Sequence, residues 1–178
     1  SSFKTKPPFS EKQFLKHALL SAFIAQDLAK SVHLNPGEAF LAGLMKDIGI
    51  YLLAIESREK YQQVMNVTSG DYDRLIAAES SVFSTVHPVL SARLLKQWKF
   101  SNDIVMGVAN HHSPEKSQEA FQAYAYLVFL CEYAAMKLGV GNGVAGFTED
   151  HEDSEIFLQA LEYFGLAAEV FDDLIEHT

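Results

Sequence analysis

The chain has 178 residues, of which 48% are hydrophobic, and 14 Lys and Arg against 23 Asp and Glu give a formal net charge of −9. This length and apolar content suffice for one domain with a single sizeable core. The acidic balance argues against nucleic acid and membrane partners, because duplexes and anionic membranes bind through excess positive charge. A single cysteine, Cys131, excludes an intrachain disulfide and favours a cytoplasmic location.

No stretch of the sequence reaches the roughly 18 uncharged apolar residues that a membrane span needs. The nearest approach, residues 123–136, contains Glu132. We interpret residues 1–9 as an N-terminal extension or an expression remnant, and residues 10–178 as one helical domain.

Hydrophobic residues recur at helical spacing almost throughout, which predicts about nine helices. Ser10 is predicted to cap the first helix, and Asn35 with Pro36 to begin a second that continues to Ala54. The later helices are predicted near residues 57–66, 72–82, 85–98, 101–112, 118–138, 154–164 and 167–177, with an acidic loop over 148–153. No segment shows the alternating pattern of a strand, so the predicted fold class is an all-α, single-domain helical bundle.

Several ionisable side chains lie on or beside apolar helical stretches: His17, Asp47, His87, His111, His112 and Glu132. Each histidine alone is typical of a core residue that one hydrogen bond satisfies. Glu132 is harder to explain in this way, because an unpaired carboxylate in a central helix is costly without a cation or a donor. Imidazoles and two carboxylates from separate helices are also a ligand set that iron, manganese or zinc accepts.

Residues 43–49 read Gly-Leu-Met-Lys-Asp-Ile-Gly, which resembles the Gly-Leu-Leu-His-Asp-Ile-Gly signature of HD-superfamily domains. Further segments resemble the HDOD branch, the HD-related output domain of bacterial signalling proteins, in the same order along the chain: 14–19, Glu79 with 87–98, and 108–114. The resemblance covers about residue 10 to the end. It implies a helical bundle around the HD metal pocket, without the additional N-terminal helical portion that family members usually have.

The chain departs from this signature at Lys46, where the resemblance implies a metal-ligating histidine before Asp47, and Glu132 stands for a later aspartate. A protonated lysine has three donors and no lone pair, so it cannot ligate a metal. We hypothesise that the Lys46 ammonium replaces the metal and pairs with both carboxylates. Two alternatives stay open: Lys46 extends to solvent while the histidines pack, or a metal site survives on His17, Asp47, His87, His111, His112 and Glu132.

The leading functional hypothesis is a non-catalytic bacterial signal-transduction domain that binds a signalling protein partner or a small ligand. The expected pocket residues are His17, Lys46, Asp47, His87, His111, His112 and Glu132, and no metal or other cofactor is expected. The alternative is an HD-type phosphohydrolase for a nucleotide or cyclic dinucleotide, in which Fe, Mn or Zn activates a bridging water. A third alternative is a structural remnant that serves as a homodimerisation module.

Overall fold

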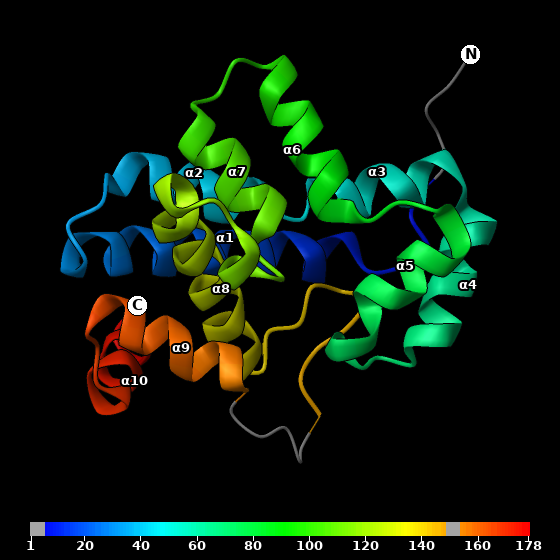
Figure 1. Cartoon of the computed structure of the whole chain (residues 1–178). Coiled ribbons are helices and arrows are strands. Elements are labelled where there is room, and N and C mark those ends of the chain that lie inside the picture. Colours follow the sequence, from blue (N-terminus) through cyan, green and yellow to red (C-terminus); the bar gives the residue numbers. More distant parts are fainter. Residues whose placement is uncertain (1–5, 149–153) are drawn as a thin grey trace.

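The computed structural model describes residues 6–148 and 154–178 and is built almost wholly of helices (Figure 1). Its α-helices are α1 (Glu11–Ser31), α2 (Pro36–Met45), α3 (Ile48–Glu56), α4 (Arg58–Thr68), α5 (Leu75–Phe83), α6 (His87–Gln97), α7 (Asn102–Asn110), α8 (Gln122–Lys137), α9 (Glu155–Phe164) and α10 (Ala168–Glu176). Short 3-10 helices are η1 (Tyr72–Arg74), η2 (Pro114–Lys116) and η3 (Glu119–Phe121). The described residues contain no strand, only an isolated bridge between Asp71 and Gly146. The predicted all-α fold class is confirmed.

The predicted helix starts are confirmed by capping hydrogen bonds. The Ser10 hydroxyl accepts from the N–H of Gln13 at 3.2 Å. The Asn35 side chain accepts from two N–H groups of the first turn of α2, at 2.9 and 3.1 Å, and Pro36 is the first residue of that helix. These bonds satisfy N–H groups that have no partner within the helix, which is why short polar residues mark helix starts in the sequence.

The segment predicted as one helix from 36 to 54 is two helices, α2 and α3, separated by Lys46 and Asp47. In a continuous helix the N–H of Gly49 would donate to the carbonyl of Met45. Here it donates to Oγ of Ser91 on α6, at 2.9 Å. The described residues therefore contain ten α-helices, and the break turns two consecutive ionisable side chains into the interior.

Two glycines allow helices to approach closely beside this break. A Cβ at Gly43 would lie 2.8 Å from the carbonyl oxygen of Ser21, so α2 packs against α1 only because the side chain is absent. A Cβ at Gly49 would lie 2.2 Å from the carbonyl oxygen of His87, the first residue of α6. Both contacts are shorter than a carbon side chain permits, so glycine at 43 and 49 sets the positions of α1 and α6 around residues 46 and 47.

Helix α8 is central, as its apolar sequence predicts. Every residue from Tyr124 to Met136 is buried, including Glu132, and the helix packs against α1, α2, α7 and α9. In Figure 1, α3, α4 and α5 form one end of the molecule and α9 and α10 the other. Among the described residues, no helix combines the length and hydropathy that crossing a bilayer requires.

The predicted extension over 1–9 is described only from residue 6, and most of the predicted acidic loop over 148–153 lies outside the described residues. The described part of the extension, residues 6–9, packs onto the domain. Phe9 is buried, with its ring centroid 5.8 Å from that of Tyr61. The Arg58 guanidinium donates to the carbonyl oxygens of Lys6 and Pro7, at 2.6 and 2.8 Å.

Candidate functional site

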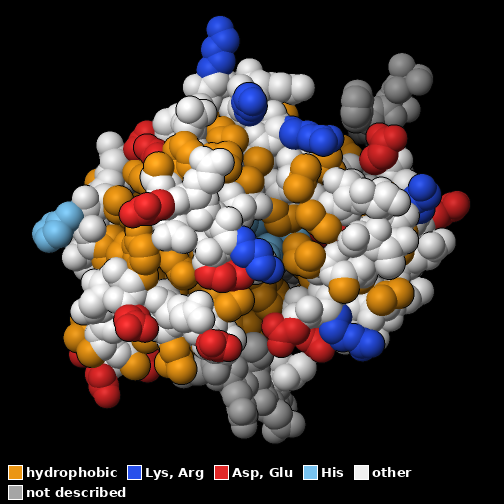
Figure 2. Space-filling view, viewed as in Figure 1, with side chains coloured by type: hydrophobic (Ala, Val, Ile, Leu, Met, Phe, Trp, Pro, Cys, Tyr) orange, Lys and Arg blue, Asp and Glu red, His pale blue; other side chains and the backbone are white. Residues whose placement is uncertain are grey.

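The structure brings together all seven pocket residues that the sequence predicts, and we call them the ionisable cluster: His17, Lys46, Asp47, His87, His111, His112 and Glu132. They come from α1, from the break between α2 and α3, from the start of α6, from the end of α7 and from α8. All are buried except His112, whose side chain is 15% exposed. Figure 2 shows histidine atoms in a hollow near the centre of the face that it presents.

The Lys46 ammonium lies in the middle of one half of the cluster. Its Nζ donates to Oδ2 of Asp47 and to Nε2 of His17 at 2.9 Å, and lies 3.4 Å from Oε1 of Glu132. Ligand-type atoms of the other three residues all lie within 4.8 Å of one another, so they surround a single position. Lys46 is fully buried, which excludes the interpretation that it extends to solvent.

The charges of this half stabilise one another against burial. Burial disfavours the charged form of Lys46, but the carboxylates of Asp47 and Glu132 outweigh it and raise the Lys46 pKa. Burial also disfavours both carboxylates, yet the ammonium holds the pKa of Asp47 well below its usual range. The pKa of Glu132 is likewise held well below its usual range, chiefly by Lys46. One cation thus faces two anions at neutral pH.

The orientation of His17 is set by the backbone that follows α8. Its Nδ1–H donates to the carbonyl oxygen of Val140 at 2.7 Å. The other ring nitrogen, Nε2, therefore carries a lone pair, which accepts the hydrogen bond from Lys46. A metal-ligating histidine is held in the same way, with one N–H on a carbonyl and the other nitrogen on the cation.

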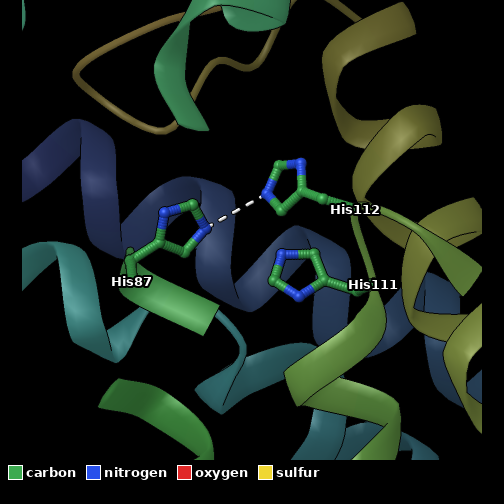
Figure 3. A group of neighbouring side chains, drawn as sticks. All are labelled: His87, His111 and His112. Atoms are coloured by element: carbon green, nitrogen blue, oxygen red, sulfur yellow. Dashed lines mark hydrogen bonds between the residues drawn. The ribbon is translucent and has the colours of Figure 1, made fainter. Parts of the chain in front are cut away.

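The other half of the cluster consists of His87, His111 and His112 (Figure 3). Nε2 of His87 and Nε2 of His112 are 3.1 Å apart, which places a hydrogen between them. His111 donates its Nδ1–H to the carbonyl oxygen of Val108 at 2.7 Å, so its Nε2 faces the cluster. That nitrogen is 3.2 Å from Oε2 of Glu132, and it has no hydrogen-bond partner among the described residues.

Glu79 holds His87 in position from behind. Its Oε2 accepts from both the backbone N–H and Nδ1–H of His87, at 2.7 and 2.8 Å, and its Oε1 accepts from the hydroxyl of Tyr61 at 3.0 Å. Burial lowers the pKa of His87, but the Glu79 carboxylate outweighs burial and raises it. Because His87 Nδ1 carries a hydrogen, its Nε2 accepts from His112 when the His87 ring is neutral and donates to His112 when the ring is protonated.

Three residues beside the cluster were not among the predicted pocket residues: Tyr72 and Glu79, which contact it, and Tyr61, which donates to Glu79. The Tyr72 hydroxyl lies 3.2 Å from Nδ1 of His112, and the two rings stack with centroids 5.4 Å apart. Glu79 carried a signal, as a carboxylate in an apolar helical stretch that the family resemblance includes. Tyr61 and Tyr72 gave no such signal in the sequence, because single tyrosines on amphipathic helices are common core residues.

The two halves differ in their fit to a metal ion. The histidine half fits. Two nitrogen ligands of a tetrahedral zinc ion lie roughly 3.3 Å apart, and Nε2 of His87 and Nε2 of His112 are 3.1 Å apart. The half around Lys46 does not fit, because an ammonium already lies among its donor atoms. Near the histidines, the carboxylate oxygens Asp47 Oδ1 and Glu132 Oε2 are buried, and neither accepts a hydrogen bond from the described residues. Hydrogen-bond acceptors therefore outnumber donors at this place.

The fold and the cluster define an all-α domain built around buried histidines and carboxylates. The family model of the HDOD domain matches residues 1–114, more than half of the chain, and the protein belongs to the HDOD family. The match includes every cluster residue except Glu132. A search of curated proteins gives no match.

Solved structures share the fold. The MmoQ response regulator of Methylococcus capsulatus is 23% identical, with a TM-score of 0.67, over 94% of this chain and 61% of that one. A candidate signal transduction protein of Marinobacter aquaeolei is 20% identical, with a TM-score of 0.75, over 99% and 39%. A candidate phosphohydrolase of Shewanella amazonensis is 21% identical, with a TM-score of 0.73, over 97% and 61%. The present chain therefore spans less than two thirds of each of these proteins.

Proposed function

We propose that this HDOD domain is a non-catalytic regulatory module of bacterial signal transduction, in which the Lys46 ammonium replaces one metal ion of an HD-type site. A single observation carries the proposal. Nζ of Lys46 lies among His17 Nε2, Asp47 Oδ2 and Glu132 Oε1, three atoms of the types that bind metals. The contacts orient these side chains as a cation would.

An ammonium supplies the charge of a cation without its chemistry. A metal ion acts as a Lewis acid and lowers the pKa of a bound water to about 7. Lys46 has no empty orbital; its ammonium donates to His17 and Asp47 and forms an ion pair with Glu132. No water can be activated at this position, so a two-metal hydrolytic site is not available to the chain.

The regulatory role is supported by family membership and by two of the similar structures, one a response regulator and one a candidate signal transduction protein. We infer that the domain acts by binding a signalling partner or a small ligand. The cluster then serves as a rigid polar core that holds α1, α3, α6, α7 and α8 in one arrangement.

The alternative function is metal-dependent phosphoester hydrolysis with fewer metal ions, favoured by the fit of the histidine half. In that case His87, His111 and His112 would hold Fe, Mn or Zn, and the metal would supply Lewis acidity and a water of low pKa. The similarity to a candidate phosphohydrolase concerns the fold and is compatible with both functions.

Elemental analysis of the purified protein distinguishes the two functions. We expect no stoichiometric Fe, Mn or Zn in the wild type and a gain of metal in Lys46→His, which restores a ligand at position 46. The matched control is Lys116→His, at a lysine whose side chain is 76% exposed, and it should gain no metal. Stoichiometric metal in the wild type would overturn the non-catalytic role and favour hydrolysis.

A further inference from the structure

The ionisable cluster approaches the surface at one of its residues, His112. The side chains of the other six are no more than 1% exposed, whereas that of His112 is 15% exposed. Histidine atoms are visible from outside in the hollow of Figure 2. A solute that approaches the cluster past the described residues therefore meets His112 first.

A cavity of about 230 Å³ lies directly outside His112 and opens to the surface. His112 is the one member of the cluster among the described residues that line this cavity. Tyr72 of η1 lines it as well, and its ring stacks on the His112 ring with centroids 5.4 Å apart. Tyr72 and His112 together thus form the wall between the cavity and the buried part of the cluster.

The Tyr72 hydroxyl closes this wall with a hydrogen bond. Its oxygen lies 3.2 Å from Nδ1 of His112. Because a hydroxyl can both donate and accept, the bond forms with either tautomer of His112. On its inner side, Nε2 of His112 lies 3.1 Å from Nε2 of His87 and 3.8 Å from Oε2 of Glu132. Displacement of Tyr72 would therefore free the outer side of His112, the ring that covers His87 and Glu132.

The element that carries Tyr72 is held by few interactions. η1 is a single turn of three residues, none of which is buried. The N–H of Gly146 donates to the carbonyl of Gly70 at 3.0 Å, and the N–H of Tyr72 donates to the carbonyl of Gly146 at 3.1 Å. The Tyr72 ring also meets the ring of Phe147, with centroids 5.6 Å apart. Short segments with little buried surface are the ones that open locally, so η1 can move while the core helices stay in place.

We propose that Tyr72 is a gate between the cavity and the ionisable cluster. A small solute reaches His87 and His111 only when η1 moves and Tyr72 gives up its ring stacking and its hydrogen bond with His112. The inference goes beyond the proposed function, because the route is the same whether the histidines hold a metal or hydrogen-bond to one another. The cavity is small beside the roughly 300–1,000 Å³ of drug-sized sites, so it suits a small molecule and not a dinucleotide.

Diethyl pyrocarbonate, a small reagent that acylates accessible imidazole nitrogens, tests the gate. Peptide mass spectrometry of the full chain gives the reaction rate at each histidine. In the wild type we expect the exposed His33 to react fast, and His87 and His111 to react slowly. In Tyr72→Ala both buried histidines should react roughly tenfold faster or more, because one ring stack and one hydrogen bond are lost. Unchanged rates at His87 and His111 in Tyr72→Ala overturn the proposal.

A second variant and a control accompany Tyr72→Ala. Tyr72→Phe keeps the ring and removes the hydroxyl, so His87 and His111 should react roughly twofold to tenfold faster, as the loss of one hydrogen bond implies. Tyr163→Ala is the matched control, because Tyr163 is 43% exposed on α9 and is not part of the described lining. Its buried histidines should react as those of the wild type do.

The rate at His17 separates gating from unfolding. His17 belongs to the cluster but is engaged by Lys46 and by the carbonyl of Val140, away from Tyr72. Opening of the gate accelerates His87 and His111 more than His17, whereas unfolding accelerates all three alike. Equal acceleration of all three in Tyr72→Ala would overturn the gate.

The gate and the proposed function fail independently. The reaction rates are compared between variants in the presence of a chelator, so they do not depend on the metal content. Stoichiometric metal in the untreated wild type would overturn the non-catalytic role and leave the gate standing. Closed and open variants with the same rates at His87 and His111 would overturn the gate and leave the metal analysis unaffected.

Discussion

Lys46 and His17 form a direct hydrogen bond, in which the ammonium donates to Nε2 of the imidazole at 2.9 Å. The same imidazole donates its Nδ1–H to the carbonyl of Val140. The lone pair that would ligate a metal is thus used by an ammonium of the same protein. Since the ammonium also pairs with Asp47 and Glu132, removing it leaves three oriented acceptors without a donor.

Replacing Lys46 by methionine should destabilise the domain by about 3–5 kcal/mol, the usual cost of leaving buried charges without their partner. The side chain keeps its approximate volume, so a cavity contributes little to the loss. Urea unfolding of wild type and Lys46→Met measures it. Lys30→Met is the control, because Lys30 pairs with Asp27 on the surface and should cost no more than about 1 kcal/mol. Equal stability of Lys46→Met and wild type would show that no buried charge pair exists.

The pH dependence of stability should differ between wild type and Lys46→Met. The pKa values of Asp47 and Glu132 are lower in the folded than in the unfolded protein, so their contribution is present at neutral pH. It is lost only as pH falls below the ordinary carboxyl values of 3.8 and 4.5. The Lys46 pKa is raised, so its contribution is lost only above pH 10.5.

Without Lys46, burial acts on the two carboxylates unopposed and raises their pKa values. Lys46→Met should therefore gain stability relative to the wild type as pH falls from neutral. Urea midpoints measured between neutral pH and pH 4.5 distinguish the two slopes. Parallel curves for the two proteins would contradict the ion pairing of Lys46 with Asp47 and Glu132.

Gly49→Ala should destabilise the domain by about 3 kcal/mol, at the upper end of the usual cost of overpacking. The added Cβ would lie 2.2 Å from the carbonyl oxygen of His87, so α3 and α6 must move apart. Gly146→Ala is the control, because a Cβ there lies 3.6 Å from the nearest atom, an ordinary contact. Thermal unfolding of both variants makes the comparison, and similar melting temperatures would show that α6 is not held against α3 at this point.

Glu79→Gln should lower the pKa of His87. The Glu79 carboxylate is the group that raises this pKa against burial, and an uncharged amide of the same shape removes that effect. A titration of the His87 ring signals by NMR measures the change. Tyr61→Phe, which removes only the hydroxyl that donates to the far oxygen of Glu79, should leave the His87 pKa closer to wild type. An unchanged His87 pKa in Glu79→Gln would mean that another group sets it.

The helical fold was predictable because its signals are local. Helical periodicity and the capping residues Ser10 and Asn35 act within one turn of the chain, and the structure confirms both caps. The pocket residues were predictable for a different reason. Ionisable side chains on apolar helical stretches are costly to bury alone, and the resemblance to the HDOD signature indicated a common pocket and singled out Lys46.

Other features of the structure depend on tertiary contacts, which local sequence signals do not contain. The helix predicted through residues 36–54 is interrupted at Lys46 and Asp47, where Ser91, distant in sequence, accepts the hydrogen bond from the N–H of Gly49. Glu79 and Tyr72 reach the histidines through the packing of α5 and η1. The sequence could name Lys46 as the exception to a family signature. Whether its ammonium faced solvent or three buried acceptors depended on the side chains around it, which α1, α3 and α8 bring from separate parts of the chain.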